Sequence, residues 1–158
     1  MKLRNLIGIE SDKALILSER LNMLLADYQV FYMNARSLHW NIRGDKFFEL
    51  HVKFEELYNN LIIKVDEVAE RILTLGFTPI HAFSDYLKIS EIKESKDIHE
   101  GQDGVALVID SFQKIILKQR ELLKLSGDAD DEGTNALMSD YIREQEKLIW
   151  MYASYLNK

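Results

Sequence analysis

The sequence predicts an all-α fold, a four-helix bundle in which a long crossover with one short helix joins the second long helix to the third. Residues that favour helices dominate the 158-residue chain, and only seven glycines and one proline interrupt it. Apolar residues recur at alternating spacings of three and four over long stretches, which is the period of one buried helix face. A chain of this length is typical of one domain, so we expect residues 1–158 to form a single domain.

Two apolar stripes predict the first pair of helices. The first helix is expected from Ser11, a capping residue, to Leu38. Its stripe consists of Leu17, Leu21, Leu24, Tyr28, Phe31, Ala35 and Leu38. Gly44 interrupts the pattern, and a second stripe then runs from Leu50 to Leu75. The first two helices are therefore expected to form a hairpin.

The second pair of helices follows a less regular segment. Residues 80–99 mix polar and apolar groups and indicate a crossover with one short helix. The third helix is expected from about Asp103 to Ser126, where Gly127 ends it. The acidic stretch GDADDEGT then supplies an N-cap for a fourth helix from Asn135 to Leu156. Two hairpins joined by a long crossover are the connectivity of ferritin-like bundles.

The composition of the chain limits the partners and the metal ligands that it can use. The chain has 20 basic and 26 acidic residues and a net charge of -6, which opposes long-range attraction to nucleic acid or anionic membranes and favours cations. It contains no cysteine, so a metal site would have to use histidine and carboxylates. The sequence has neither a signal-peptide pattern nor an apolar run of membrane-spanning length, and we expect a cytoplasmic protein.

Candidate ligands gather on the second helix and just before it. His51 and Glu55 are four residues apart, as are Asp66 and Glu70, so each pair shares a helix face. This face points roughly 130° away from the apolar stripe of the same helix. The same side also carries Tyr58, Ile62 and Ala69. A partly apolar face turned away from the core suggests a cover other than solvent, and the natural cover is another subunit.

The length of the helix separates the two pairs. Glu55 and Asp66 lie eleven residues apart, roughly 16 Å along a helix axis, so one helix cannot bring both to one metal ion. If two copies pack antiparallel about a two-fold axis near Asn60 and Leu61, the second pair of one chain comes opposite the first pair of the other. The two-fold axis would then create two equivalent sites.

His39 can join each of these sites, because only a short turn separates it from His51. The complete candidate set is His39, His51, Glu55, Asp66 and Glu70. Imidazoles together with carboxylates suit Fe(II), with Zn(II) as a competitor on affinity grounds.

Simpler interpretations exist for each residue alone. Single carboxylates on a helix are usually solvated, and Lys64, Glu67 and Arg71 offer surface ion pairs. His81 and His99 lack carboxylates in register and are interpreted as surface residues. The cluster of Asp128, Asp130, Asp131 and Glu132 is most simply a helix cap, and Tyr28, Phe31 and Tyr32 are interpreted as core and flanking packing.

The stretch HWNIRGDKFFELHVKFEELY, followed by DEVAERILTLG, resembles the Dps family of mini-ferritins over most of the chain. The family pattern is a His-Trp at the end of the first helix, a second His twelve residues on, an acidic residue four later, and then an Asp with a Glu four beyond. Here the pattern falls on His39, His51, Glu55, Asp66 and Glu70. Glu55 departs from the Asp that many members have.

The resemblance implies a ferroxidase centre between subunits of a hollow dodecamer, with Trp40 beside it. Two His and one acid would come from one chain, and Asp plus Glu from its two-fold mate. The implied activity is oxidation of Fe(II), with hydrogen peroxide preferred over dioxygen, and storage of the ferric mineral. The acidic segment resembles the lining of the family's iron channels, which makes Asp128, Asp130 and Asp131 channel candidates.

Three alternatives remain. A conventional ferritin would use Glu-x-x-His pairs inside one bundle, and no such pair occurs. A nucleoid-binding protein in which DNA binding dominates would need a basic tail, whereas the termini offer only Lys2, Arg4, Lys13 and Lys158, so DNA binding is doubtful. A metal-free helical scaffold would explain the apolar stripes but not the ligand set.

Overall fold

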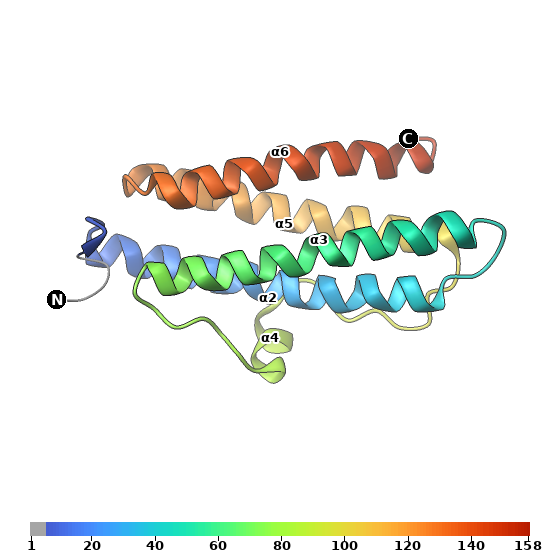
Figure 1. The fold of residues 1–158 in the computed structure, drawn as a ribbon, viewed down its shortest axis with the longest axis horizontal. Helices are drawn as coiled ribbons and strands as arrows, with labels where there is room; N and C mark the ends of the chain where they lie inside the picture. Colours follow the sequence, from blue (N-terminus) through green and yellow to red (C-terminus); the bar gives the residue numbers. More distant parts are fainter. Residues whose placement is uncertain (1–5) are drawn as a thin grey trace.

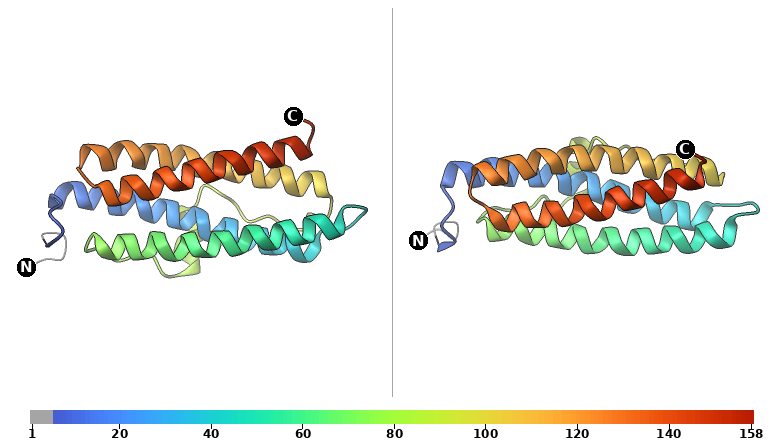
Figure 2. Two further views of the ribbon diagram at one scale, coloured as in Figure 1. Left: turned by 45° about the horizontal axis from the view of Figure 1, so that its top comes forward. Right: turned by 90° about the horizontal axis from the view of Figure 1, so that it is seen from above.

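The computed structural model describes residues 6–158, and within them it contains helices and no strand. The helices are α2 (Ser11–Asn41), α3 (Phe47–Thr74), α4 (Phe83–Ile89), α5 (Gly101–Asp128) and α6 (Glu132–Tyr155). The four long helices lie side by side as two hairpins, α2 with α3 and α5 with α6 (Figures 1 and 2). The crossover from α3 to α5 carries α4 on the outside of the bundle (Figure 1). The predicted all-α bundle with a short crossover helix is confirmed.

The ends of the helices differ from the prediction by one to three residues; α2 continues to Asn41 rather than Leu38, and α6 begins at Glu132 rather than Asn135. Glu10, rather than Ser11, occupies the N-cap position of α2. The prediction that Gly127 ends the third helix is wrong, because α5 continues to Asp128. The chain leaves the helix at Asp130, whose φ of 55° is left-handed, a conformation that Asp tolerates better than most residues. Gly44, with φ 102°, is the turn residue expected between the first two helices.

Aromatic and aliphatic side chains from all four long helices fill the core. Tyr28, Phe31, Phe54 and Phe112 are among the largest side chains that are fully buried. Phe31 of α2 meets Phe112 of α5 edge-on, with ring centroids 5.0 Å apart. The stripes that predict the helices are therefore the faces that pack together.

Polar side chains of α2 hold the crossover in place. The buried carboxylate of Asp27 accepts hydrogen bonds from the Ser90 hydroxyl at 3.0 Å and from the Glu91 amide at 2.8 Å, and it pairs with Lys118. Asn34 also bonds two backbone groups of the crossover, at 2.9 and 3.0 Å. These contacts satisfy backbone groups in a segment that mostly lacks secondary structure, so the long crossover has a defined path.

Candidate metal centre

His39 and His51 form a stacked pair where α2 ends and α3 begins. Their ring centroids are 3.8 Å apart and their planes are 14° from parallel. Nδ1 of His39 lies 2.6 Å from the carbonyl oxygen of His51, and Nδ1 of His51 lies 2.8 Å from the carbonyl oxygen of His39. A carbonyl can only accept, so each Nδ1 carries the proton and donates it to the other residue's backbone. The short turn after α2 brings the two helix ends together and makes this exchange feasible.

With Nδ1 used as the donor, the neutral form of each ring presents Nε2 as its lone pair. A histidine that donates its other ring N–H to a carbonyl oxygen is the usual arrangement of a metal ligand, because the bond fixes both the tautomer and the ring orientation. Phe47 stacks on His51 with centroids 4.9 Å apart, and Tyr58 meets His39 edge-on at 5.4 Å. The two imidazoles are therefore held in place before any metal arrives.

The three candidate carboxylates lie along the exposed side of α3. Glu55, Asp66 and Glu70 are all exposed, and their carboxylates form no ion pair or hydrogen bond with any of residues 6–158. The interpretation that these carboxylates form surface ion pairs with Lys64 or Arg71 is therefore wrong. Both cations turn toward α6 instead.

Lys64 is buried and donates to Asn60 Oδ1 at 2.8 Å and to Glu144 at 2.9 Å. Arg71 pairs with Asp131 at 2.5 Å. Lys64 and Arg71, the basic residues nearest to Asp66 and Glu70 in the sequence, thus form their ion pairs on another side of α3. The candidate carboxylates therefore remain available to bind a cation.

The five candidate ligands do not converge within one chain. The described residues contain no group of three or more His, Asp or Glu side chains placed to hold a metal ion. This agrees with the separation of Glu55 from Asp66 along one straight helix. The neighbouring apolar side chains Trp40, Val52 and Ile62 are 56%, 51% and 39% exposed, which is typical of a surface that a second chain covers.

The acidic turn between α5 and α6 divides into two kinds of residue. Asp131 is buried, caps α6 by accepting from the Thr134 amide at 3.0 Å, and pairs with Arg71. Asp128 and Asp130 are exposed. The predicted N-cap in this stretch is confirmed. The carboxylate of Asp131 is buried and already paired, which argues against the prediction that it lines a channel. For Asp128 and Asp130 the channel role stays a prediction.

The interior of the bundle holds a neutral polar triad rather than a carboxylate site. The Tyr28 hydroxyl donates to Gln119 Oε1 at 2.5 Å and accepts from Gln145 Nε2 at 2.6 Å. Gln119 Nε2 closes the ring by donating to Gln145 Oε1 at 2.7 Å. All three groups are buried and mutually satisfied. This arrangement counts against a metal centre of the conventional ferritin type, inside one bundle.

The other two histidines lie apart from the stacked pair. His81 is exposed, and its Nδ1 lies 2.9 Å from the Pro79 carbonyl. His99 is partly exposed, with Nδ1 2.8 Å from the carbonyl oxygen of Asn41. Both serve as local contacts of the crossover, as expected for surface residues.

Sequence reasoning missed Arg36, which lies one helical turn before His39. Its guanidinium carbon is 4.9 Å from the Trp40 ring centroid and 5.6 Å from that of Tyr58. The spacing from Arg36 to Trp40 is four residues, so the helical period could have placed these two side chains together. The contact with Tyr58 of α3 depends on how the two helices pack.

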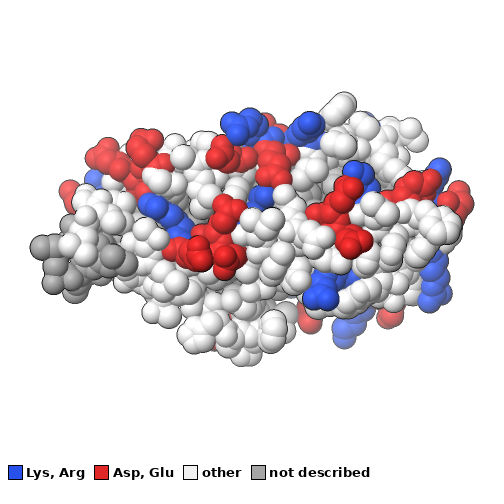
Figure 3. All heavy atoms as spheres, viewed as in Figure 1, with Lys and Arg blue, Asp and Glu red and all other residues white. Residues whose placement is uncertain are grey.

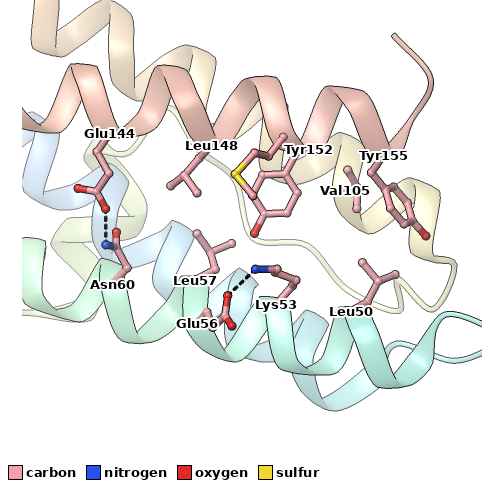
Figure 4. A pocket seen from close by; sticks show the side chains of 11 residues that line it. Leu50, Lys53, Glu56, Leu57, Asn60, Val105, Glu144, Leu148, Tyr152 and Tyr155 are labelled. Atoms are coloured by element: carbon pink, nitrogen blue, oxygen red, sulfur yellow. Dashed lines mark hydrogen bonds and ion pairs between the residues drawn. The ribbon is translucent and has the colours of Figure 1, made fainter.

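A pocket of 330 Å³ opens between α3 and α6, away from the candidate ligands (Figure 4). Its walls are mainly apolar and include Leu57, Leu148 and Tyr152. Lys53 and Glu56 form an exposed ion pair at its rim, 2.8 Å apart. The pocket contains none of the five predicted ligands.

Acidic side chains are prominent on the face that includes α3 (Figure 3). Lysine and arginine are interspersed among them, and no continuous basic surface occurs on this face (Figure 3). Among the described residues, no helix is both long enough and apolar enough to span a bilayer.

Comparison with known proteins agrees with this architecture. The family model of the ferritin-like domain matches residues 18–158. The DNA protection during starvation protein of Porphyromonas gingivalis is 42% identical over 157 residues, which cover 99% of each chain.

Solved structures give the same result. The Dps protein of Vibrio cholerae O1, described as a member of a broad superfamily of ferritin-like diiron-carboxylate proteins, is 53% identical with a TM-score of 0.96, and the match covers 99% of this chain and 98% of that one. A Dps protein from Bacillus brevis is 30% identical with a TM-score of 0.89, over 93% of this chain and 99% of that one. The chain therefore belongs to the Dps family of ferritin-like proteins.

Proposed function

We propose that this protein is a ferroxidase that oxidises Fe(II) between two-fold-related subunits and stores the product as ferric mineral inside a hollow dodecamer. The observation that carries the proposal is the stacked His39–His51 pair, whose Nδ1 protons are committed to carbonyl oxygens at 2.6 and 2.8 Å. Two neutral imidazoles with free Nε2 atoms and exposed carboxylates without partners suit Fe(II) as the substrate.

The two-fold partner completes each site. His39, His51 and Glu55 of one chain bind Fe(II) together with Asp66 and Glu70 of the partner, which brings carboxylates to an ion that the imidazoles already hold. Anionic ligands stabilise Fe(III) more than Fe(II), so the site lowers the free energy of the oxidised product. Zn(II) competes for the same donors.

Hydrogen peroxide is the proposed oxidant, with dioxygen as the alternative. Two Fe(II) ions each lose one electron, and one peroxide gains both as its O–O bond breaks and two protons join it to give two waters. Fe(III) then hydrolyses, releases protons and mineralises in the cavity. The benefit to the cell is removal of both reactants of radical-forming iron chemistry.

Fe(II) enters through acidic channels to which Asp128 and Asp130 contribute. Both carboxylates are exposed, close to the start of α6, which Asp131 caps. A cluster of like charge concentrates a divalent cation at its mouth. Asp130→Asn is expected to slow iron oxidation at low Fe(II) concentration and to leave the rate at saturating Fe(II) unchanged.

The experiment that tests the function mixes Fe(II) with peroxide anaerobically and follows ferric absorbance, after light scattering has sized the particle. The parent protein should oxidise Fe(II) rapidly as a particle of about twelve chains. His51→Ala should remove rapid oxidation and leave assembly intact, while His81→Ala, a histidine outside the site, should match the parent. Equal rates in the parent and His51→Ala would overturn the assignment.

DNA protection is a second candidate function, because the Porphyromonas gingivalis relative is named for it. The charge of this chain opposes that function. Lys13 is held by Glu10 at 3.7 Å and by the Asp128 carbonyl at 3.0 Å, whereas Lys2 and Arg4 lie outside the described residues. A mobility-shift titration at about 0.15 M salt should show no retained DNA, since few phosphates would be neutralised. Salt-sensitive retention would support the second candidate.

A further inference from the structure

Arg36 lies in a cluster of aromatic rings beside the candidate metal centre. Its guanidinium carbon is 4.9 Å from the ring centroid of Trp40, 5.5 Å from that of Tyr32 and 5.6 Å from that of Tyr58. Tyr58 also meets the ring of His39 at 5.4 Å. The ring of Tyr58 therefore contacts both the guanidinium of Arg36 and the predicted ligand His39.

The hydrogen bonds of this guanidinium are incomplete. Nη1 donates to the Tyr32 hydroxyl at 3.3 Å. Nε is buried without an acceptor, one of only two such side-chain atoms among residues 6–158. No carboxylate of the described chain pairs with Arg36, although Lys64, Arg71 and Lys118, whose side chains are at most 19% exposed, each have one. Its own chain encloses Nε, so a partner would reach the terminal N–H groups of the guanidinium, and a carboxylate is the acceptor that matches these groups best.

The proposed two-fold packing supplies a carboxylate at this point. An axis near Asn60 and Leu61 sets the partner's Asp66 opposite Glu55. Tyr58, on which Arg36 rests, is one helical turn from Glu55 on the same side of α3. In this register the partner's Asp66 is the acidic residue expected to lie nearest to Arg36.

We propose that Arg36 is a positioning residue of the centre: its guanidinium binds one carboxylate oxygen of the partner's Asp66, and the other oxygen faces the metal. The inference rests on the proposed function only for the position of the two-fold axis. It goes beyond the ligand set by assigning a residue that holds a ligand across the interface rather than binding the metal.

The charges of the assembled site explain why such a residue is useful. Three carboxylates, Glu55 from one chain and Asp66 and Glu70 from the other, converge on one place and repel one another when no metal is bound. Arg36 brings a fixed positive charge against that group and donates hydrogen bonds to one member of it. Outer-shell partners of this kind orient ligands, and their loss commonly weakens metal binding by about 10- to 100-fold.

A double-mutant cycle on metal-free protein tests the pairing directly. Thermal unfolding is measured in the presence of a chelator for the parent, Arg36→Met, Asp66→Asn and the double variant. A direct pair makes the two melting-temperature shifts non-additive, because either substitution alone breaks the same bond. Additive shifts would overturn the proposal. Arg143→Met, which removes an arginine 79% exposed beside Asp140, is the matched control and should shift the melting temperature little.

Binding of Co(II), a redox-stable substitute for Fe(II), gives the second readout. Arg36→Met should weaken Co(II) affinity by about tenfold or more, and Arg36→Lys should recover part of the loss because it restores charge without the planar fork. Unchanged or tighter Co(II) binding in Arg36→Met would also overturn the inference. If Arg36→Met does not assemble, the same cycle with Arg36→Lys replaces it.

The two proposals fail separately. A parent protein that does not oxidise Fe(II) but shows coupling between Arg36 and Asp66 would sink the function and keep the interface contact. A parent protein that oxidises Fe(II) and shows no coupling would keep the function and reject the role of Arg36.

Discussion

His39 and His51 orient each other, each donating its Nδ1 proton to the backbone carbonyl of the other, with their rings 3.8 Å apart. Two residues twelve positions apart thus share one local structure, in which neither imidazole can turn without breaking its hydrogen bond to the backbone of the other residue. The arrangement fixes the direction of both Nε2 atoms in the metal-free chain.

This relationship predicts one tautomer for both residues. Solid-state ¹⁵N spectra of histidine-labelled protein near neutral pH should show protonated Nδ1 and unprotonated Nε2 at His39 and His51. Addition of Zn(II) should shift these two Nε2 signals and leave those of His81 and His99 unchanged, because the latter two lie outside the centre. Zn(II) shifts at all four histidines would indicate nonspecific binding instead.

The division of ligands between two chains predicts complementation. A chain carrying His51→Ala and Glu55→Ala and a chain carrying Asp66→Ala and Glu70→Ala should each lack rapid Fe(II) oxidation. Co-assembled in equal amounts, they should recover about a quarter of the parental sites, since half of the dimers are mixed and each mixed dimer holds one intact site. The measurement is peroxide-dependent Fe(II) oxidation by mixtures assembled together and by assemblies mixed afterwards. Assemblies mixed afterwards should stay inactive. If the co-assembled chains also recover no Fe(II) oxidation, the division of ligands between two chains is contradicted.

Breaking the pair between Arg71 and Asp131 should strongly destabilise the fold. The Asp131 side chain is 1% exposed and that of Arg71 is 19% exposed, so Arg71→Met leaves a buried carboxylate without its cation. We expect a loss of about 3–5 kcal/mol in the free energy of unfolding. Denaturant titration of metal-free protein measures it, with Arg120→Met as the control.

The control pair of Arg120 and Glu146 is about half exposed on both sides, and its loss should cost at most about 1 kcal/mol. Gly133→Ala is expected to disturb the pair between Arg71 and Asp131, because a Cβ at residue 133 would lie 2.7 Å from Nη1 of Arg71. Equal losses in Arg71→Met and Arg120→Met would contradict the structural role of Asp131.

The central triad predicts sensitivity to alkali. Burial raises the pKa of Tyr28 well above its ordinary value, so the folded protein keeps the phenol protonated at pH values where the unfolded chain ionises it. This contribution to stability is fully present well below the unfolded pKa of 10.0 and is lost progressively as the pH rises through and above that value. Tyr28→Phe should reduce this alkaline loss but not abolish it, because burial also raises the pKa of Tyr141 and of Tyr152.

The same substitution should lower stability at neutral pH by about 1–3 kcal/mol, because Gln119 and Gln145 lose a hydrogen-bond partner in the core. Thermal melts between pH 8 and 11 measure both effects. A parent whose stability does not change over that range would contradict the assignment.

Much of the fold follows from periodicity. The apolar stripes along the first two helices locate one face of each, and Phe31 and Phe54 on those stripes are fully buried. A stripe depends only on the geometry of its own helix, so sequence suffices to find it. The same local geometry places His51, Glu55, Asp66 and Glu70 away from the core. The spacing of Glu55 and Asp66 alone shows that one copy of α3 cannot bring both to one metal ion.

Tertiary structure decided what lies opposite each polar group. Lys64 and Arg71 are close to the candidate ligands in the sequence. The packing of the helices nevertheless pairs them with Glu144 and Asp131. Asp131 looks like its neighbours Asp128 and Asp130 in sequence, and only the fold buries it. Sequence determined the directions in which side chains leave their own helices. The partners of Lys64 and Arg71 were decided by tertiary structure, because Glu144 and Asp131 are far from them in the chain and come within reach only when the helices pack.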